Sequence, residues 1–533
     1  MTFVITQGCC DDASCVSVCP VQCIRPRPGD PDFKTTEQLY IDPATCIDCG
    51  ACMDECPVNA IYPEWDLPDQ HSEFLEINSD YFAMNPNAVC SPPQSPTRSL
   101  PAERPSLSVA VVGTGPAGCY AATELSDING VTVSIFDRLP TPFGLVRSGV
   151  APDHAATKQI TKRFNGLFSR PNVQAYLNVE VGRDINVSEL LEHHHAVIWA
   201  VGASDDRKLG ITGEDLPGCV SAREFVAWYN GHPDAVDHRY DLESKRVVVI
   251  GNGNVAVDVA RLLARPVGSL ARTDAADHAI EAFRASAVEE VVVTARRGPE
   301  SAAYTTGEMV GLRHVDGVQL AVHEDEVNDA VASSPLVART VGRIFQPATS
   351  GQDRTITFRY GLTPCAINGD ERVRSVTFRR PDGTNEEIET GLVIRAIGFR
   401  GRRVDGLPFD ERAGVVPNVA GSVHDPETGE PVVGVYCTGW IKRGATGVIG
   451  TNKVDSAETI GSLLSDFAAG RLPTPVGGQD ILAALLHERK PDLVDGEGWQ
   501  RIDRAERKAG RKARRPRQKL VTIAELLAAS RRE

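Results

Sequence analysis

Two strand-length apolar runs in this chain are each followed by glycines and then by a helix-length segment. The first run, residues 108–112, precedes Gly113, and the second run, residues 245–250, precedes Gly251. A buried strand, a tight glycine turn and a helix in this order open the βαβ unit that binds dinucleotides. The pattern predicts an α/β protein with two Rossmann-like domains.

The first unit continues into a second predicted strand, residues 131–136, which ends in Asp137. Glycines let backbone N–H groups approach a pyrophosphate at the positive end of a helix, and the acid is placed to accept hydrogen bonds from ribose hydroxyls. We therefore expect the first dinucleotide to be held by Gly113, Gly115, Ala117, Gly118 and Asp137.

The second unit differs at the end of its second strand, residues 290–295, because Arg296 and Arg297 follow where an acid is usual. A carboxylate would accept a hydrogen bond from a ribose 2′-hydroxyl, whereas two guanidinium groups pair with a 2′-phosphate. The arginines therefore favour NADPH over NADH. The expected contacts to NADP(H) are Asn252, Gly253, Asn254, Val255, Arg296 and Arg297.

Cysteines are concentrated near the start of the chain, with nine of the 14 within residues 9–56. The first residues lack a basic segment followed by an apolar one, so we expect a cytoplasmic protein, in which disulfides are rare. Residues 46–57 have the spacing C-x2-C-x2-C-x3-C-P, which resembles bacterial ferredoxins and predicts iron-sulfur ligation. A zinc site would need two C-x2-C pairs with a longer spacer between them.

An upstream half mirrors this motif, because Cys15 and Cys19-Pro20 repeat the spacing of Cys52 and Cys56-Pro57. Exchange of the fourth ligand between the halves puts Cys46, Cys49, Cys52 and Cys19 on one 4Fe-4S cluster, and Cys9, Cys15 and Cys56 on the other. The flanking sequence resembles seven-iron ferredoxins, whose first cluster is 3Fe-4S, but the loop between Cys9 and Cys15 is shortened. Whether the adjacent Cys10 is a ligand, and whether this cluster is 3Fe-4S or 4Fe-4S, stays open.

The loop of residues 139–154 and the glycine-rich segment of residues 438–453 resemble the adrenodoxin reductase family of ferredoxin-NADP reductases. This resemblance implies that the first dinucleotide is FAD. It also implies that His154 and Glu308 polarise the site of hydride transfer, with Glu308 close to the nicotinamide. The further contacts to FAD that it implies are Leu145, Val181, Trp440, Gly447, Val448 and Ile449.

We expect a small α+β bacterial ferredoxin domain in front of the two Rossmann-like domains, with a Pro/Ser-rich linker between them. The FAD domain is expected in two chain segments, with the NADP domain inserted. The expected units are a two-cluster head at 1–83, the linker at 84–105, the FAD domain at 106–242 and 391–470, the NADP domain at 243–390, and a C-terminal extension with a basic tail at 471–533.

Composition and charge limit the classes of partner that the chain is expected to bind. With 41% hydrophobic and 24% charged residues and only short apolar runs, the chain is expected to insert no segment into a membrane. The net charge is −15, and residues 1–83 hold 15 acidic against 3 basic residues. Residues 501–519 hold 10 basic against 2 acidic residues, but without interleaved aromatic residues we expect no nucleic-acid partner.

Together these features predict an NADPH:ferredoxin oxidoreductase that passes a hydride to FAD and single electrons to the fused clusters. The electrons then leave for a ferredoxin or another one-electron acceptor protein. One alternative is the electron-input subunit of a larger complex, similar to the small subunit of glutamate synthase. The other is a head that only docks an external ferredoxin.

Overall fold

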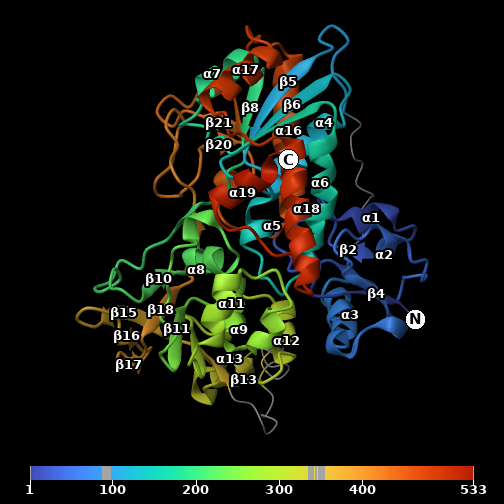
Figure 1. The fold of residues 1–533 in the computed structure, drawn as a ribbon. Coiled ribbons are helices and arrows are strands. Elements are labelled where there is room, and N and C mark those ends of the chain that lie inside the picture. The colour runs from blue at the N-terminus through green and yellow to red at the C-terminus, as the bar shows by residue number, and fades with distance from the viewer. Residues whose placement is uncertain (1, 87–97, 334–340, 342–344, 346–353, 532–533) are drawn as a thin grey trace.

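The computed structural model describes residues 2–86, 98–333, 341, 345 and 354–531. Its architecture is a small cysteine-rich head, drawn in blue in Figure 1, beside two larger α/β bodies and a C-terminal helical segment drawn in red. Half of the expected linker at 84–105 lies outside the described residues, at 87–97. None of the described helices combines the length and the apolar character needed to cross a membrane.

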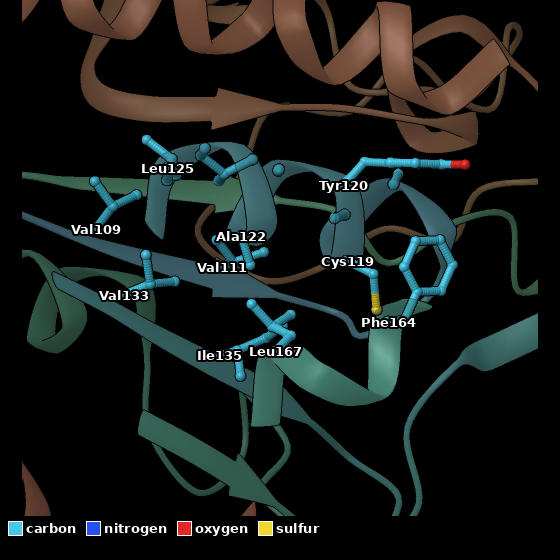
Figure 2. Packing of buried hydrophobic residues seen from close by; sticks show 14 of the residues in the cluster. Val109, Val111, Cys119, Tyr120, Ala122, Leu125, Val133, Ile135, Phe164 and Leu167 are labelled. Atoms are coloured by element: carbon cyan, nitrogen blue, oxygen red, sulfur yellow. The ribbon is translucent and has the colours of Figure 1, made fainter. Parts of the chain in front are cut away.

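The first large body is built on a seven-stranded sheet that contains the first glycine turn. Its strands lie in the order β20-β21-β22-β8-β5-β6-β7, and β22, β8, β5, β6 and β7 are parallel. Figure 2 shows how α4 covers one face of this sheet, with Leu125 and Ala122 directed toward Val109 and Val111. The strands are β5 (Leu107–Val112), β6 (Val131–Asp137), β7 (Val173–Leu177), β8 (Ala196–Trp199), β20 (Asn418–Val419), β21 (Ser422–His424) and β22 (Pro431–Cys437).

Helices pack on both faces of this sheet, which explains why its central strands are almost wholly apolar. The helices are α4 (Pro116–Ser126), α5 (Gly144–Ser148), α6 (Ile160–Asn165), α7 (Val187–His193), α15 (Trp440–Arg443) and α16 (Thr451–Ala468).

The second large body contains the second glycine turn in a six-stranded parallel sheet of order β10-β18-β11-β12-β14-β13. Its strands are β10 (Cys219–Ser221), β11 (Arg246–Ile250), β12 (Glu290–Thr294), β13 (Val318–Val322), β14 (Arg354–Arg359) and β18 (Leu392–Arg395). Its helices are α8 (Ala222–Tyr229), α9 (Asn254–Ala264), α10 (Val267–Leu270), α11 (Asp277–Arg284), α12 (Thr306–Arg313) and α13 (Asn328–Ser333). A separate antiparallel sheet joins β15 (Thr363–Asn368), β16 (Ser375–Arg379) and β17 (Asn385–Glu389).

The chain passes between the two large bodies twice, and the two connecting segments lie side by side. Strand β9 (Asp205–Asp206) leaves the first body and pairs antiparallel with β19 (Phe399–Arg400), which returns to it. Strands β10 and β18 belong to the second sheet, although the expected boundaries at 242 and 390 assign them to the first. We therefore propose that the domain boundaries lie at β9 and β19, because a strand belongs with the sheet to which it is hydrogen-bonded.

The head consists of two similar halves around one hydrophobic cluster. Strand β1 (Phe3–Ile5) pairs with β4 (Ile61–Pro63), and β2 (Ile24–Arg25) pairs with β3 (Tyr40–Ile41). The short helices α1 (Ser14–Val18) and α2 (Ala51–Glu55) each follow a cysteine-rich loop, and α3 (Phe74–Met84) closes the domain. An α/β protein with a ferredoxin-like head is therefore confirmed.

The basic tail is part of the folded core. Helices α18 (Gly496–Lys512) and α19 (Ile523–Ser530) pack on the first body through Trp499 and Leu526. Helix α17 (Gln479–Arg489) packs on it through Leu482 and Leu486. Two of the tail's basic residues, Arg515 and Lys519, are 8% and 7% exposed, and they pair with Asp277 and Asp274 of the second body. The basic run thus binds acidic groups of its own chain.

Candidate functional site

The first glycine turn leaves the start of helix α4 open. Gly113 has φ +104°, and a Cβ there would lie 2.5 Å from the carbonyl oxygen of Ala200, so only glycine fits. Next to it, a Cβ on Gly115 would meet no atom within 4 Å. Gly144, the first residue of α5, passes close to this turn: a Cβ added at Gly144 would lie 3.0 Å from the Cα of Gly115. The free N–H groups at this helix start suit the phosphates of a dinucleotide.

Asp137 lies at the end of β6, as the sequence predicts, and it is already hydrogen-bonded to the chain. Its Oδ2 accepts from the Thr114 backbone N–H at 3.0 Å, and its Oδ1 accepts from that of Leu139 at 3.0 Å. Burial raises the pKa of this carboxyl, and the bonds from Thr114 and Leu139 oppose that rise. Its Oδ2 also accepts from the Thr114 hydroxyl, so the lone pair that can accept a bond from a ribose hydroxyl is on Oδ1.

The segment after β22 packs directly on the start of α4. Gly439 has φ +78°, its Cβ would lie 2.6 Å from the Cβ of Ala117, and its N–H donates to Asp455 at 2.5 Å. Asp455 also pairs with Lys442 and Arg443, which fixes α15 in place.

Trp440 begins α15, and its ring is held from two sides. Its indole N–H donates to the Thr446 carbonyl at 3.0 Å, and the ring stacks on Phe399 with the centroids 5.7 Å apart. Gly447, Val448 and Ile449 follow and are exposed or half-buried, and Ile449 packs against the hydrophobic cluster that contains Ala117. Gly439 and Ile449 thus bring this segment beside the start of α4.

The two other residues expected at the flavin have different surroundings. Leu145 follows Gly144 on α5 and is 38% exposed. Val181 is buried in a hydrophobic cluster together with Val112, the last residue of β5. Leu145 thus stands at the open turn, whereas Val181 supports the strand end beneath it.

The second glycine turn repeats this geometry at helix α9. Gly251 has φ +118°, and a Cβ there would lie 2.2 Å from the carbonyl oxygen of Ala396. The residues Asn252, Gly253, Asn254 and Val255 are all half-buried, and the Oδ1 of Asn254 accepts from the Thr305 N–H at 2.8 Å. Arg296 and Arg297 follow β12 and are exposed, and neither has an ion pair among the described residues. This arrangement fits a dinucleotide with an additional phosphate.

His154 and Glu308 come together at a buried arginine. The Nε2 of His154 lies 3.6 Å from the Oε2 of Glu308, although the two residues are far apart in the sequence. Arg261 of α9 donates to His154 at 2.8 Å and to Glu308 at 3.4 Å. Together with Asp258, these groups are close enough to hold a metal ion, but the guanidinium of Arg261 already supplies the positive charge there.

Arg261 and its acidic partners are site residues that the motif analysis missed. Arg261 is 3% exposed and also pairs with Asp153 at 2.8 Å. Burial opposes ionisation of Asp153, but Arg261 outweighs it and lowers the pKa of the carboxyl well below its ordinary value. The sequence signal is the pair Asp258 and Arg261, three residues apart on a helix that is otherwise apolar on that face.

The first group of thiols, which we call the distal group, consists of Cys19, Cys46, Cys49 and Cys52. Burial, and then the neighbouring thiols of Cys46, Cys19 and Cys49, raises the pKa of Cys52 to about 12. Mutual repulsion of this kind is what a bound cation relieves, because metal ligation deprotonates thiols. Cys49 is exposed, so this group reaches the surface of the head.

The second group, which we call the proximal group, consists of Cys9, Cys15 and Cys56, with Cys10 beside them. These four residues line one cavity together with Asp11 and Asp12. Burial, followed by the thiols of Cys56 and Cys52, raises the pKa of Cys15 well above its ordinary value. The predicted ligands thus lie close together in the head, and the donor atoms of both groups fit iron-sulfur clusters, while their division into two ligand sets stays a prediction.

The proximal group lies against the glycine-rich segment of the first body. The N–H of Gly450 donates to the Cys10 carbonyl at 2.7 Å, and a Cβ on Gly450 would lie 2.0 Å from the carbonyl oxygen of Asp11. Asp12 accepts from Tyr120 at 2.7 Å and pairs with Arg163 at 3.1 Å. The motif analysis missed this docking contact because nothing in the local sequence shows which residues meet across domains.

Comparison with known proteins agrees with this geometry. The family described as pyridine nucleotide-disulphide oxidoreductase matches residues 107–436, and the 4Fe-4S binding domain matches residues 39–62. A probable ferredoxin/ferredoxin–NADP reductase of Mycobacterium bovis (strain ATCC BAA-935 / AF2122/97) is 49% identical over 99% of this chain and 95% of its own length. The chain belongs to the ferredoxin/ferredoxin–NADP reductase family.

The reductase part has relatives that lack the full length of this chain. NADPH:adrenodoxin oxidoreductase of Arabidopsis thaliana is 40% identical over 80% of this chain and 95% of its own length. The structure of Mycobacterium tuberculosis FprA in complex with NADPH has a TM-score of 0.75 at 39% identity, and covers 80% of this chain and 99% of its own. The expected family is therefore confirmed, and the chain is an oxidoreductase with a nucleotide-binding reductase part and a 4Fe-4S domain.

Proposed function

We propose that the chain carries electrons from NADPH through FAD to two iron-sulfur clusters in its own head, and then to an external ferredoxin or another one-electron acceptor protein. The observation that carries this proposal is the contact between Gly450 and the proximal loop, with the Gly450 N–H 2.7 Å from the Cys10 carbonyl oxygen. Bound FAD supplies the conversion between the electron pair of NADPH and the single electrons of iron-sulfur clusters.

The burial of the two thiol groups supports an order along the head. Cys10 and Cys15, on the loop of residues 9–15, are buried, and Cys9 and Cys56 of the proximal group pack against the core of the first body. Cys49 of the distal group is exposed instead. The buried group is thus next to the flavin segment, and the exposed group is the one an external protein can approach.

Exposed apolar side chains surround the distal group. Ile47 and Met53 are 57% and 40% exposed, and Val18 and Val21 beside Cys19 are 36% and 38% exposed. Exposed apolar residues that cluster with acidic neighbours are typical of a protein contact site. We place the acceptor protein on this surface.

Residues of the chain itself hold the two nucleotides. For FAD, we propose that the start of α4 holds the phosphates, Asp137 holds a ribose, and Trp440 with Gly447–Ile449 lines the ring. For NADP(H), we propose that the start of α9 holds the pyrophosphate and that Arg296 and Arg297 hold the 2′-phosphate.

The group around Arg261 orients the site of hydride transfer. The guanidinium of Arg261 lies 2.8 Å from the Nε2 of His154 and holds the imidazole ring in place. Glu308 balances the guanidinium charge from the other side at 3.4 Å. We propose that His154 and Glu308 polarise the nicotinamide site while Arg261 fixes their positions.

The test separates electron flow through the head from direct flow out of the flavin. In the Cys49→Ser variant, NADPH-driven reduction of cytochrome c is expected to fall about tenfold or more, equivalent to about 1.4 kcal/mol in the barrier. Reduction of ferricyanide, a small acceptor that reaches the flavin directly, is expected to stay unchanged.

The matched control is Cys365→Ser, which removes a thiol from β15, away from the head. This variant is expected to keep both activities. If Cys49→Ser keeps the full rate with cytochrome c, the head only docks an acceptor and the proposed relay is wrong.

A further inference from the structure

The two halves of the head correspond residue by residue. Cys9, Cys15 and Cys19 differ in number from Cys46, Cys52 and Cys56 by one constant offset, and the same offset relates Pro20 to Pro57. Helices α1 and α2 begin at equivalent positions under this offset. The loop between Cys9 and Cys15 is therefore as long as its counterpart in the second half, and is shortened only relative to seven-iron ferredoxins.

The backbone follows the same correspondence. Positive φ angles occur at Asp11 and its counterpart Asp48, with values of 55° and 56°. They occur again at Ala13 and Gly50, the residues that precede the two helices. Left-handed conformations at matching non-glycine positions are uncommon, so the two loops share one specific fold.

Hydrogen bonds to sulfur repeat in the same way. The N–H of Cys23 donates to the Sγ of Cys19 at 3.3 Å, and the N–H of Ala60 donates to the Sγ of Cys56 at 3.3 Å. Since Cys23 corresponds to Ala60, its position needs no thiol. Cys23 is therefore not expected to be a ligand.

Under this correspondence, Cys10 occupies the position of Ile47, and Asp12 occupies the position of Cys49. Ile47 is 57% exposed and is not one of the predicted ligands of the second half. Cys10 borders the proximal cavity, but it is also buried in the hydrophobic cluster that the head shares with the first body. The ligand position of the proximal loop is thus filled by Asp12, and not by Cys10.

The Asp12 side chain binds residues of the reductase part. Its Oδ2 accepts from the Tyr120 hydroxyl at 2.7 Å, and its Oδ1 accepts from Ser14 and from Arg163. The Nζ of Lys453 lies 3.7 Å from Oδ1 and donates to the Asp12 carbonyl at 2.9 Å. The carboxylate is therefore held by groups from three separate parts of the first body.

We propose that Asp12 determines the type of the proximal cluster, which is held by Cys9, Cys15 and Cys56 alone and has three irons because the fourth ligand position carries an anchored carboxylate. This inference rests on the proposed function, which assigns a cluster to these thiols. A 4Fe-4S cluster needs a ligand at each iron, and the repeat places the fourth ligand of the proximal cluster at residue 12. Because the Asp12 carboxylate is bound to the first body, it is not free to ligate a fourth iron. The same side chain anchors the head on the reductase part.

The test compares Asp12→Cys with Cys10→Ser by iron analysis and electron paramagnetic resonance of the purified, reconstituted protein. Asp12→Cys is expected to gain one iron per chain and to lose the signal of an oxidised three-iron cluster. Cys10→Ser is expected to keep the iron content and that signal. Loss of iron or of the signal in Cys10→Ser would make Cys10 a ligand and overturn the proposal.

A third variant, Asp12→Asn, keeps the shape of the side chain but cannot replace a carboxylate ligand. It is expected to keep the three-iron signal. If the unchanged protein lacks that signal and Asp12→Asn creates it, Asp12 ligates a fourth iron and the three-iron assignment is wrong. The signal of the distal cluster, lost in Cys49→Ser, reports separately on the proposed relay.

Discussion

Gln7 of the head donates a hydrogen bond to Glu308 of the second body, with its Nε2 3.1 Å from Oε2. The same Glu308 oxygen lies 3.4 Å from Arg261 and 3.6 Å from His154. Nearby, Glu37 of the head accepts from the N–H of Thr306, at the start of the helix that carries Glu308. The head thus contacts the proposed nicotinamide site as well as the flavin segment.

The first prediction concerns the charge of Glu308. Glu308→Gln keeps the shape of the side chain but leaves the buried Arg261 with less compensation, so the hydride-transfer step is expected to slow by about tenfold. Anaerobic stopped-flow measurement of flavin reduction by NADPH checks this. Gln7→Ala, which removes only the contact from the head, is the control and is expected to change that rate less than twofold. Equal rates for Glu308→Gln and the unchanged protein would contradict a polarising role for the carboxylate.

A second prediction concerns the contact between Gly450 and the proximal loop. Gly450→Ala places a Cβ 2.0 Å from the carbonyl oxygen of Asp11, so the head must shift away from the flavin segment. Reduction of cytochrome c is expected to fall about tenfold while ferricyanide reduction is kept. Gly461→Ala on α16, the helix that Gly450 precedes, is the control, because a Cβ there would meet only the Arg98 guanidinium at 3.9 Å. An unchanged cytochrome c rate in Gly450→Ala would show that this contact is not the electron route.

Local sequence was sufficient for the two nucleotide turns, because Gly113 and Gly251 each stand between an apolar strand and a helix start. Local sequence did not show that β18 belongs to the second sheet, because an apolar strand has the same pattern in either sheet. The role of Arg261 also depends on partners distant in sequence, such as His154 and Glu308. The sequence alone could have identified Asp12, because the constant offset between the two halves aligns it with Cys49.

The third prediction concerns selection between NADPH and NADH. Arg296→Ala and Arg297→Ala each remove a guanidinium that pairs with the 2′-phosphate, and each is expected to lower kcat/KM for NADPH by roughly tenfold to a hundredfold. The value for NADH is expected to stay within about twofold, because NADH lacks that phosphate. Steady-state kinetics with both nucleotides checks this, with exposed Arg284→Ala as the control. Equal losses for both nucleotides would assign the arginines to another part of the cofactor.

The fourth prediction concerns the C-terminal extension. Glu506 of α18 is fully buried and pairs with Arg147, from the segment of residues 139–154, and with Arg517 of the basic tail. Glu506→Ala leaves the partly buried guanidinium groups of Arg147 and Arg517 without this partner, which is expected to cost about 3 kcal/mol of folding free energy. Thermal unfolding should show a clear decrease in Tm, whereas Glu488→Ala on the exposed side of α17 should show almost none. A Tm that is unchanged in Glu506→Ala would mean that the extension contributes little to stability.

The fifth prediction concerns the pH dependence of stability and rests on His194, which is fully buried behind the first sheet. Its Nδ1 lies 2.8 Å from the Leu190 carbonyl oxygen, and burial lowers its pKa from 6.5 to about 4. Between these two values the unfolded chain binds a proton that the folded chain does not, so stability is present above pH 6.5 and is lost as the pH falls toward 4. The loss is expected to reach roughly 3 kcal/mol. His194→Asn should therefore unfold at a lower Tm at neutral pH but lose less of it on acidification, whereas exposed His487→Asn should follow the unchanged protein. A variant curve parallel to that of the unchanged protein would show that other groups control the acid sensitivity.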